Sequence, residues 1–335
     1  MKRQLFILLG ACLLSGFLAK LPAQTIVYAF DKKIELPGDG GYDYLSIDAV
    51  NNRLYVSHGT KVDVIDLSTE KPIGTIDGLE GVHGIAIAND VNKGFISDGK
   101  ANTVVVFDLK TLKKITTIPI AGKDPDAITY DPFSKRVFTF NGDSGNSSVI
   151  DASTLKEIGT VALGGAPEFA IPDGKGKIYN NLEDKNSLNV IDTKSLKVIG
   201  NFPLAPCGGP TGLAVDQQHQ RLFTVCRQNK GMSVVDIDSK KVITTLPIGA
   251  GVDAVAYDPS TQLIFCSNGD GTTTIIKQET ADNYTVVQTL ETQTRAKTLA
   301  LDLNTHKIYL SAPDFEKGTR NRIPGTFKVL VYRKQ

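Results

Sequence analysis

The sequence predicts an all-β fold, a seven-bladed β-propeller whose blades are four-stranded antiparallel sheets. Two observations predict it. A short apolar strand ends in Asp or Asn seven times, at positions 48, 89, 131, 173, 216, 258 and 302, so that successive units lie 41 to 44 residues apart. Between these anchor positions the hydrophobic pattern has no helical period. Four short strands with four turns fill about 42 residues, the length of one propeller blade.

The order of strands within each unit is constant. The first strand ends in a turn such as Asp131–Lys135, and a second strand follows, such as Arg136–Phe140. A third strand rich in β-branched residues, such as Val104–Asp108, leads through a polar turn to a fourth, such as Lys114–Ile118. β-Branched and aromatic residues favour strands, whereas Asp and Pro favour turns. Each unit therefore predicts one antiparallel sheet.

The two ends of the chain favour a closed ring over a linear stack of sheets. The last unit has its third strand at Phe327–Tyr332 and lacks a fourth. A spare strand around Lys32–Leu36 precedes the first complete unit. Pairing of these two segments would complete the last blade and remove exposed sheet edges. We therefore expect a single propeller domain over residues 24–335, with its ring closed by an N-terminal strand.

Residues 1–23 match a secretory signal peptide. Lys2 and Arg3 precede an apolar segment from Leu5 to Ala19, and Ala23 offers a small residue before a cleavage point. This segment is short for a membrane span, which needs about 20 residues. An uncleaved anchor and lipidation at Cys12 are the alternatives. We expect a periplasmic or secreted protein of the bacterial envelope, without a membrane span after signal removal.

The charge balance bears on the kind of partner. Lys and Arg together number 37, and Asp and Glu 36. Residues 1–23 hold three basic residues and no acid, so the remainder carries 34 basic and 36 acidic residues. A general nucleic-acid binder needs a basic surface, so nucleic acid is not the expected partner. We expect instead a protein or a small polar ligand, and a monomeric chain.

The repeat resembles the YVTN-type propeller repeat. The likeness is carried by Leu54–His58, by Arg136–Asn141 after Asp131-Pro132, and by Val149–Lys156. It covers all seven units and is similar to the YncE-like group of exported bacterial proteins. The resemblance implies seven blades and an envelope or secreted location. It implies no activity and carries over no catalytic residue.

Loops that enter the first strands of a propeller should meet at one end of its central channel. Five residues before each anchor position, the series reads Asp43, Gly84, Asp126, Glu168, Thr211, Asp253 and Lys297. Neighbouring and second-strand loops add His58, His83, Asp98 and Arg227. Crowded carboxylates repel one another, which raises their pKa values or recruits a cation. The charged members of these two series are the candidate ligand-binding residues at the channel mouth.

Within this series, Asp126, Glu168 and Asp253 are the candidate metal ligands. Oxygen ligands favour Ca²⁺ or Mg²⁺ over Zn²⁺, so we expect no cofactor other than one of these two ions. His58 and His83 could share the same face and form an alternative site for a metal or for proton transfer. The competing interpretation is a solvated rim whose carboxylates accept hydrogen bonds from loop N–H groups.

Three cysteines remain after the signal peptide. Cys207 leads into the first strand of the fifth unit, and Cys226 closes the second strand of that unit. Export makes a disulfide possible, so these two residues are candidates for one. Cys266 lies within a strand and is expected to be a buried free thiol.

The sequence contains no recognisable catalytic motif. It has no His-x-x-x-His pair, no Gly-x-Ser-x-Gly elbow and no Cys-x-x-Cys-His haem motif. We therefore expect a non-catalytic binding or scaffold module whose contact surface is the acidic channel mouth. The alternative is a divalent-metal-dependent lyase or lactonase with its site at the same mouth, by analogy with other propellers.

Overall fold

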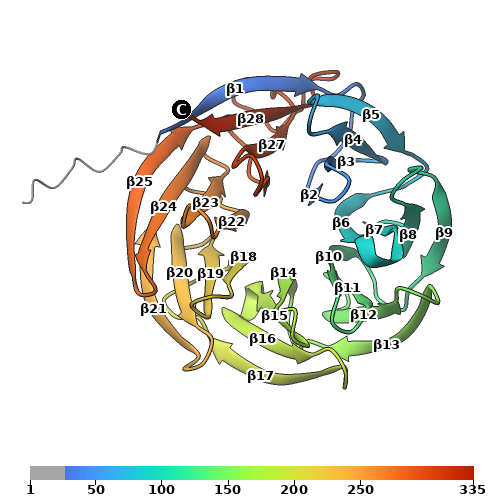
Figure 1. Cartoon of the computed structure of the whole chain (residues 1–335), viewed down its shortest axis with the longest axis horizontal. Helices are drawn as coiled ribbons and strands as arrows, with labels where there is room; N and C mark the ends of the chain where they lie inside the picture. Colours follow the sequence, from blue (N-terminus) through green and yellow to red (C-terminus); the bar gives the residue numbers. More distant parts are fainter. Residues whose placement is uncertain (1–26) are drawn as a thin grey trace, which may run out of the picture.

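The computed structural model describes residues 27–335, and the predicted signal peptide lies outside them. Within these residues, seven four-stranded antiparallel sheets form a ring around a central channel (Figure 1). The predicted seven-bladed β-propeller is thus confirmed. The described residues contain no α-helix, only two short 3₁₀ turns, η1 (Asn89–Val91) and η2 (Glu183–Lys185). None of their helices is long and apolar enough to cross a membrane.

Blades 1 to 6 are each built from four consecutive strands, ordered from the channel outward (Figure 1). Blade 1 is β2 (Leu45–Asp48), β3 (Arg53–His58), β4 (Lys61–Asp66) and β5 (Lys71–Ile76). Blade 2 is β6 (Val82–Ala88), β7 (Lys93–Asp98), β8 (Thr103–Asp108) and β9 (Lys114–Pro119). Blade 3 is β10 (Pro125–Asp131), β11 (Arg136–Asn141), β12 (Asn146–Asp151) and β13 (Lys156–Ala162).

The second half of the ring repeats this arrangement. Blade 4 is β14 (Pro167–Pro172), β15 (Lys177–Leu182), β16 (Ser187–Asp192) and β17 (Lys197–Pro203). Blade 5 is β18 (Pro210–Asp216), β19 (Arg221–Cys226), β20 (Gly231–Asp236) and β21 (Lys241–Pro247). Blade 6 is β22 (Ala254–Asp258), β23 (Leu263–Asn268), β24 (Thr272–Thr280) and β25 (Asn283–Glu291).

Blade 7 joins the two ends of the described chain. Its strands are β26 (Leu299–Leu301), β27 (Ile308–Ala312), β28 (Lys328–Lys334) and β1 (Tyr28–Glu35). β1 pairs antiparallel with β28, from Tyr28 opposite Lys334 to Glu35 opposite Lys328. The predicted closure by an N-terminal strand is therefore confirmed, and this strand begins four residues earlier than the predicted segment at Lys32.

The repeated Asp at the end of the innermost strands has a structural role. Asp48 is fully buried, and its Oδ1 accepts hydrogen bonds of 3.1 Å from the backbone N–H groups of Val50 and Asn51. Asp131 caps the equivalent turn of blade 3 in the same way. A carboxylate that satisfies turn N–H groups fixes the hairpin between the first two strands. The periodic acid in the sequence therefore marks the turns on the face opposite the channel mouth.

The apolar core is divided among the junctions between neighbouring blades. One cluster of buried hydrophobic residues lies at each of the seven junctions. At the junction of blades 1 and 2, for example, the rings of Tyr55 and Phe107 lie 5.5 Å apart between their centroids. Each blade therefore buries both of its faces, and removing water from these faces is the main stabilising contribution. The closed ring fixes the relative positions of the seven loops at the mouth.

Candidate functional site

Each of the seven blades contributes one charged side chain to the same end of the channel. We call this set the mouth cluster; its members, in blade order, are Asp43, His83, Asp126, Glu168, Arg227, Asp253 and Lys297. All of them were predicted from the repeat. Six lie just before or at the start of an innermost strand, and Arg227 follows the second strand of blade 5.

An irregular strand pairing directs several of these side chains toward the channel. The ladder between β10 and β11 skips two residues after Pro125, and Asp126 is one of them. The same irregularity lies at His83 in β6 and at Glu168 in β14. A residue that is not paired with the neighbouring strand does not have to follow the regular alternation of side chains between the two faces of the sheet. Its side chain can therefore point toward the channel.

Polar side chains of the second strands hold the mouth loops in place. The hydroxyl of Ser97 in blade 2 donates to the backbone carbonyl of Asp126 in blade 3, at 2.6 Å. Ser267 in blade 6 likewise donates to the backbone carbonyl of Lys297 in blade 7. These hydrogen bonds cross from one blade to the next, so they fix the positions of neighbouring members of the mouth cluster.

His83 lies among three carboxylates. Its Nδ1 is 2.8 Å from Oδ2 of Asp43 and 3.5 Å from Oδ1 of Asp126, and its Nε2 is 3.9 Å from Oδ1 of Asp124. Burial lowers the pKa of His83, but the hydrogen bond with Asp43 and the nearby negative charges outweigh it and raise the pKa to about 9. His83 is therefore a cation at neutral pH.

Asp253 is paired with two cations on the other side of the mouth. Its carboxylate accepts hydrogen bonds from Arg227 and from Lys297, and its side chain is only 9% exposed. A second nitrogen of Arg227 donates to Oε1 of Glu183 at 2.9 Å. Burial opposes the charge of both cations, but the charge of Asp253 raises the pKa of Arg227 and of Lys297. The charge of Asp253 is thus already balanced.

Two carboxylates of the mouth cluster, Asp126 and Glu168, lack a hydrogen-bonded cation among the described residues. Oδ1 of Asp126 is shut off from solvent and accepts no hydrogen bond from that part of the chain. Burial raises the pKa of Asp126 to about 7, and the charge of Asp43 adds to this effect. Burial likewise raises the pKa of Glu168 to about 9, with a further contribution from Asp253. These two groups are therefore the least compensated carboxylates of the cluster.

An aromatic pair forms the floor of the mouth. The ring of Tyr44 in blade 1 lies 5.6 Å from the ring of Phe169 in blade 4, and these blades lie on opposite sides of the channel (Figure 1). Burial raises the pKa of Tyr44 well above its usual value, and nearby carboxylates, Asp126 first among them, add to it. Tyr44 was not predicted as a site residue because the prediction used the position five residues before each anchor, which in blade 1 is Asp43, and Tyr44 is the residue after it.

His58 and Asp98 do not reach the channel mouth, contrary to expectation. His58 is fully buried, its ring stacks on that of Phe327 at 3.9 Å, and its Nδ1 is 2.7 Å from Oδ2 of Asp63. Asp98 is also buried and accepts backbone hydrogen bonds from the loop that begins blade 2. Both residues end the second strand of their blade. Their side chains turn away from the channel because their hydrogen-bond partners, Asp63 for His58 and the loop before β6 for Asp98, lie within the blade. Both side chains support loops and are closed to solvent, including Nε2 of His58, which has no hydrogen-bond partner among the described residues.

The structure groups the candidate metal ligands differently from the prediction. Asp253 is committed to two cations, as described above, whereas Asp43, His83 and Asp126 each offer one ligand atom within 4.8 Å of the others. This set, in which one imidazole joins two carboxylates, shares only Asp126 with the predicted trio of Asp126, Glu168 and Asp253. The three residues come from blades 1, 2 and 3.

A cavity of about 390 Å³ lies beside this trio. Asp43 and His83 line it, together with Lys100 and Arg322. Arg322 belongs to a long segment between β27 and β28 and donates to the backbone carbonyl of Gly40. The last blade therefore folds part of its chain over the loops of blade 1 and gives the mouth a wall on this side.

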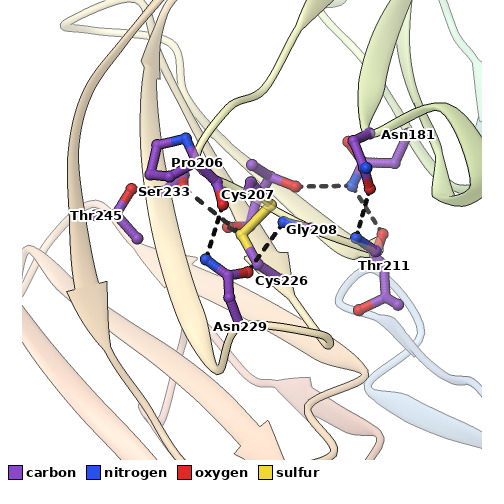
Figure 2. Close-up of a disulfide and its surroundings, with 12 residues drawn as sticks. Asn181, Pro206, Cys207, Gly208, Thr211, Cys226, Asn229, Ser233 and Thr245 are labelled. Carbon is purple, nitrogen blue, oxygen red and sulfur yellow. Dashed lines mark hydrogen bonds between the residues drawn. A yellow bond between two sulfur atoms is a disulfide. The ribbon is translucent and has the colours of Figure 1, made fainter.

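Cys207 and Cys226 form a disulfide next to the mouth (Figure 2). Their Cα atoms are 5.2 Å apart, and the bond ties the segment before β18 to the end of β19. Asn229 supports the same loop: its side chain donates to the carbonyl of Pro206 and accepts from the N–H of Gly208, each at 2.9 Å. The disulfide therefore anchors the strand end that presents the next residue, Arg227. Cys266 is buried and free.

The two remaining histidines, His219 and His306, follow innermost strands and lie on the face opposite the mouth. Nδ1 of His219 is 2.6 Å from Oδ2 of Asp216, and Nδ1 of His306 is 2.6 Å from Oδ2 of Asp258. Each histidine thus has one carboxylate partner. Unlike His83, they are not placed in the set of three ligand atoms at the mouth.

No family model matches the chain. A search among curated proteins finds antigen Lp49 of Leptospira interrogans serogroup Icterohaemorrhagiae serovar copenhageni (strain Fiocruz L1-130), 26% identical over 184 residues. The match covers 52% of this chain and only 40% of the length of that protein. It therefore shows a distant likeness over part of both proteins.

Solved structures support the fold. A chain of a crystal structure of the mitotic checkpoint complex aligns with a TM-score of 0.77, covering 98% of this chain and 99% of that one. The sequences are 14% identical over this alignment. At so low an identity the likeness shows the propeller architecture alone, and function has to be argued from the site.

Proposed function

We propose that this protein is an exported binding or scaffold module whose ligand or partner protein contacts the mouth cluster. The observation that carries the proposal is that every blade supplies one charged side chain to one end of the channel. Propeller folds present such loop faces to their ligands, and a rigid scaffold with variable loops suits recognition. The proposed ligand is polar and small enough to enter the mouth, or is a polar segment of a protein.

The charge distribution supports a ligand that carries a positive group. Asp253 is neutralised by Arg227 and Lys297, and Asp43 by His83. Asp126 and Glu168 have no hydrogen-bonded cation among the described residues, so a cationic group placed between them would gain the interactions that these groups lack. The Tyr44 ring beneath them adds a face that attracts cations.

The proposed location rests on the sequence. Residues 1–23 have the features of a cleavable export signal, and the repeat resembles that of exported YVTN-type propellers. A disulfide is also typical of oxidising compartments. N-terminal sequencing of protein purified from the bacterial envelope would test export: a mature chain beginning at Gln24 is the expected result, and an intact leader on cytosolic protein would contradict it.

Thermal melting with a panel of small ligands tests the binding role. The mature protein is melted in EDTA with amino acids, polyamines, sugars and organic acids, and hits are measured by calorimetry. A ligand at about 100 times its Kd should add about 2.7 kcal/mol to the stability of the folded state. We expect hits to contain an ammonium or guanidinium group.

Variants on the two faces of the ring provide the control. Glu168→Gln at the mouth should weaken binding of such a ligand at least tenfold, while His219→Gln on the opposite face should leave it unchanged. A ligand that binds both variants equally well lies outside the mouth, and this result would overturn the proposal. Enrichment of an envelope protein on the wild type but not on a Glu168→Lys variant would identify a protein partner.

A divalent-metal-dependent lyase or lactonase at the same mouth is the second candidate. The imidazole of His83 between two carboxylates favours it, because this arrangement can hold an ion and move a proton. Turnover of lactone or polysaccharide substrates that disappears in His83→Gln would support this candidate over a purely binding role.

A further inference from the structure

We propose that Asp43, His83 and Asp126 form a binding site for one divalent transition-metal ion, with Zn²⁺ the ion that fits best. The inference rests on the proposed function only in that both use the channel mouth. It replaces the oxygen-only set expected from the sequence by a mixed set of one nitrogen and two oxygen ligands. It also assigns the ion to blades 1 to 3 and leaves Asp253 outside the site.

The spacing of the ligand atoms matches a coordination shell. Zn²⁺ binds imidazole nitrogen and carboxylate oxygen at about 2.0–2.2 Å, which at tetrahedral or octahedral angles places neighbouring ligand atoms about 3.0–3.5 Å apart. Nδ1 of His83 lies 2.8 Å from Oδ2 of Asp43 and 3.5 Å from Oδ1 of Asp126. All three atoms lie within 4.8 Å of one another. The two distances from Nδ1 of His83 are thus close to those between neighbouring ligand atoms of one ion.

The second observation is a carboxylate oxygen that lacks a hydrogen-bond donor. Oδ1 of Asp126 is closed to solvent and accepts no hydrogen bond from the described residues, yet it points to the same nitrogen of His83. Leaving a buried carboxylate oxygen without a hydrogen bond is costly. A bound ion would satisfy this atom. The imidazole meets three carboxylates, including Asp124 at 3.9 Å, so the site has an excess of negative charge that a dication would balance.

The donor set selects the class of ion. Imidazole is a good ligand for Zn²⁺ and its neighbours in the first transition row, whereas Ca²⁺ and Mg²⁺ prefer oxygen alone. On binding, the ion replaces the proton through which Nδ1 of His83 is hydrogen-bonded to Asp43, and this proton leaves to solvent. Asp43 and His83 also line the 390 Å³ cavity, so positions on the ion that the protein leaves open can be filled by water or by a ligand entering from there.

Calorimetry of the intact mature protein tests the site. The protein is prepared without a histidine tag, stripped with EDTA, dialysed and titrated with ZnCl₂, CaCl₂ and MgCl₂ in parallel. We expect one Zn²⁺ per chain, bound at least tenfold more tightly than Ca²⁺ or Mg²⁺. Titration with CoCl₂ should produce the visible absorption of Co²⁺ bound to nitrogen and oxygen ligands.

Two site variants and two control variants distinguish this site from Zn²⁺ binding elsewhere on the protein. Asp126→Asn and His83→Gln should each reduce the affinity for Zn²⁺ at least tenfold. His306→Gln removes another histidine whose Nδ1 lies 2.6 Å from a carboxylate but which has no place in the trio, so it should leave the affinity unchanged. Asp253→Asn tests the set predicted from the sequence: because Asp253 is paired with Arg227 and Lys297 and supplies no ligand atom to this site, the affinity should fall much less than in the two site variants.

Two results would overturn the inference. One is the absence of Zn²⁺ binding to a wild-type protein whose cooperative melting in the same buffer shows that it is folded. The other is binding that survives His83→Gln but is lost in Asp253→Asn. The ligand screen of the proposed function is run in EDTA and therefore does not depend on Zn²⁺. If a polar ligand binds in that screen but Zn²⁺ does not bind to the wild type, only the proposed metal site is contradicted. If Zn²⁺ binds but no ligand of the screen binds at the mouth, only the proposed binding role is contradicted.

Discussion

The ring of Tyr44 in blade 1 lies 5.6 Å from the ring of Phe169 in blade 4, so one aromatic pair spans the central channel. On the mouth side of this pair lie charged residues. Away from the mouth, the channel is lined by apolar side chains such as Ile47, Ile171 and Val215, which border a cavity of about 470 Å³. Tyr44 therefore separates a polar chamber from an apolar one.

Removal of the Tyr44 ring should join the two chambers and destabilise the ring of blades. Because Tyr44 is half-buried, Tyr44→Ala should cost about half of the roughly 3–5 kcal/mol lost when a fully buried ring is truncated. Chemical denaturation measures this change. Tyr44→Phe keeps the ring and removes a hydroxyl that donates no hydrogen bond to a described residue, so we expect a change below about 0.5 kcal/mol. Equal losses in the two variants would show that the hydroxyl and not the ring is important.

Glu168 should make the metal-free protein less stable as the pH rises. Burial raises its folded-state pKa from the usual 4.5 to about 9. A carboxyl with a raised folded pKa binds its proton more tightly in the folded state, so stability falls as the pH increases through the range from about 4.5 to 9. Glu168→Gln cannot ionise and should raise the melting temperature by a few degrees at pH 8, with little change at pH 4.

Melting of wild-type and Glu168→Gln protein in EDTA between pH 4 and pH 9 measures this difference. Glu35→Gln is the control, since Glu35 is an exposed carboxylate on β1 and its removal should leave the pH profile of the wild type unchanged. A stabilising effect of Glu168→Gln that is the same at every pH would contradict the assigned cause.

Loss of the disulfide should weaken blade 5. A cross-link that closes a loop of this length, with a sequence separation of 19, stabilises a protein by about 3 kcal/mol. We expect the double variant Cys207→Ser/Cys226→Ser to lose about 2–4 kcal/mol. Reduction of the wild type should have the same effect, and Cys266→Ser serves as the control for a thiol outside the bond. A disulfide-free variant as stable as the wild type would show that Asn229 and the strand pairing suffice to hold the loop.

Deletion of β1 should open the ring. Tyr28, Ile34 and Leu36 are each at most 5% exposed, and burying such side chains contributes about 1.5–3 kcal/mol each. Their sum is of the same order as the whole stability of a typical domain. A protein that lacks residues 24–36 should therefore aggregate or melt at least 10 °C lower, as followed by size-exclusion chromatography and melting. Lys33→Ala, an exposed change on the same strand, should stay within about 0.5 kcal/mol of the wild type.

The repeat predicted most of the architecture because its positions are set by local chemistry. Asp48 and the Asp residues at five equivalent positions each accept hydrogen bonds from turn N–H groups, so they mark the same turn in six of the seven blades. The position five residues earlier then predicts which side chains lie near the mouth. The closure of blade 7 followed from counting strands at the two ends of the chain.

The details of the site depend on contacts between blades, which the repeat does not encode. His58 was expected at the mouth because it ends a strand there, but its ring packs on Phe327, a residue far along the chain. Asp253 was expected to bind a metal, but two cations from other blades neutralise it. Tyr44 reaches a residue three blades away. Such side-chain directions follow from packing in three dimensions and leave no periodic signal in the sequence.

The pairing of β1 with β28 also sets the order in which this protein can be assembled. β1 precedes all other strands of the described residues and β28 follows them, so the edge of β1 stays without its partner until β28 has been made. Blades 1 to 6 can form as their strands emerge, because each is a continuous segment. The final blade requires contact across almost the whole length of the chain, which is a slow kind of folding event. The ring, and with it the complete mouth, can therefore close only after β28 has been made.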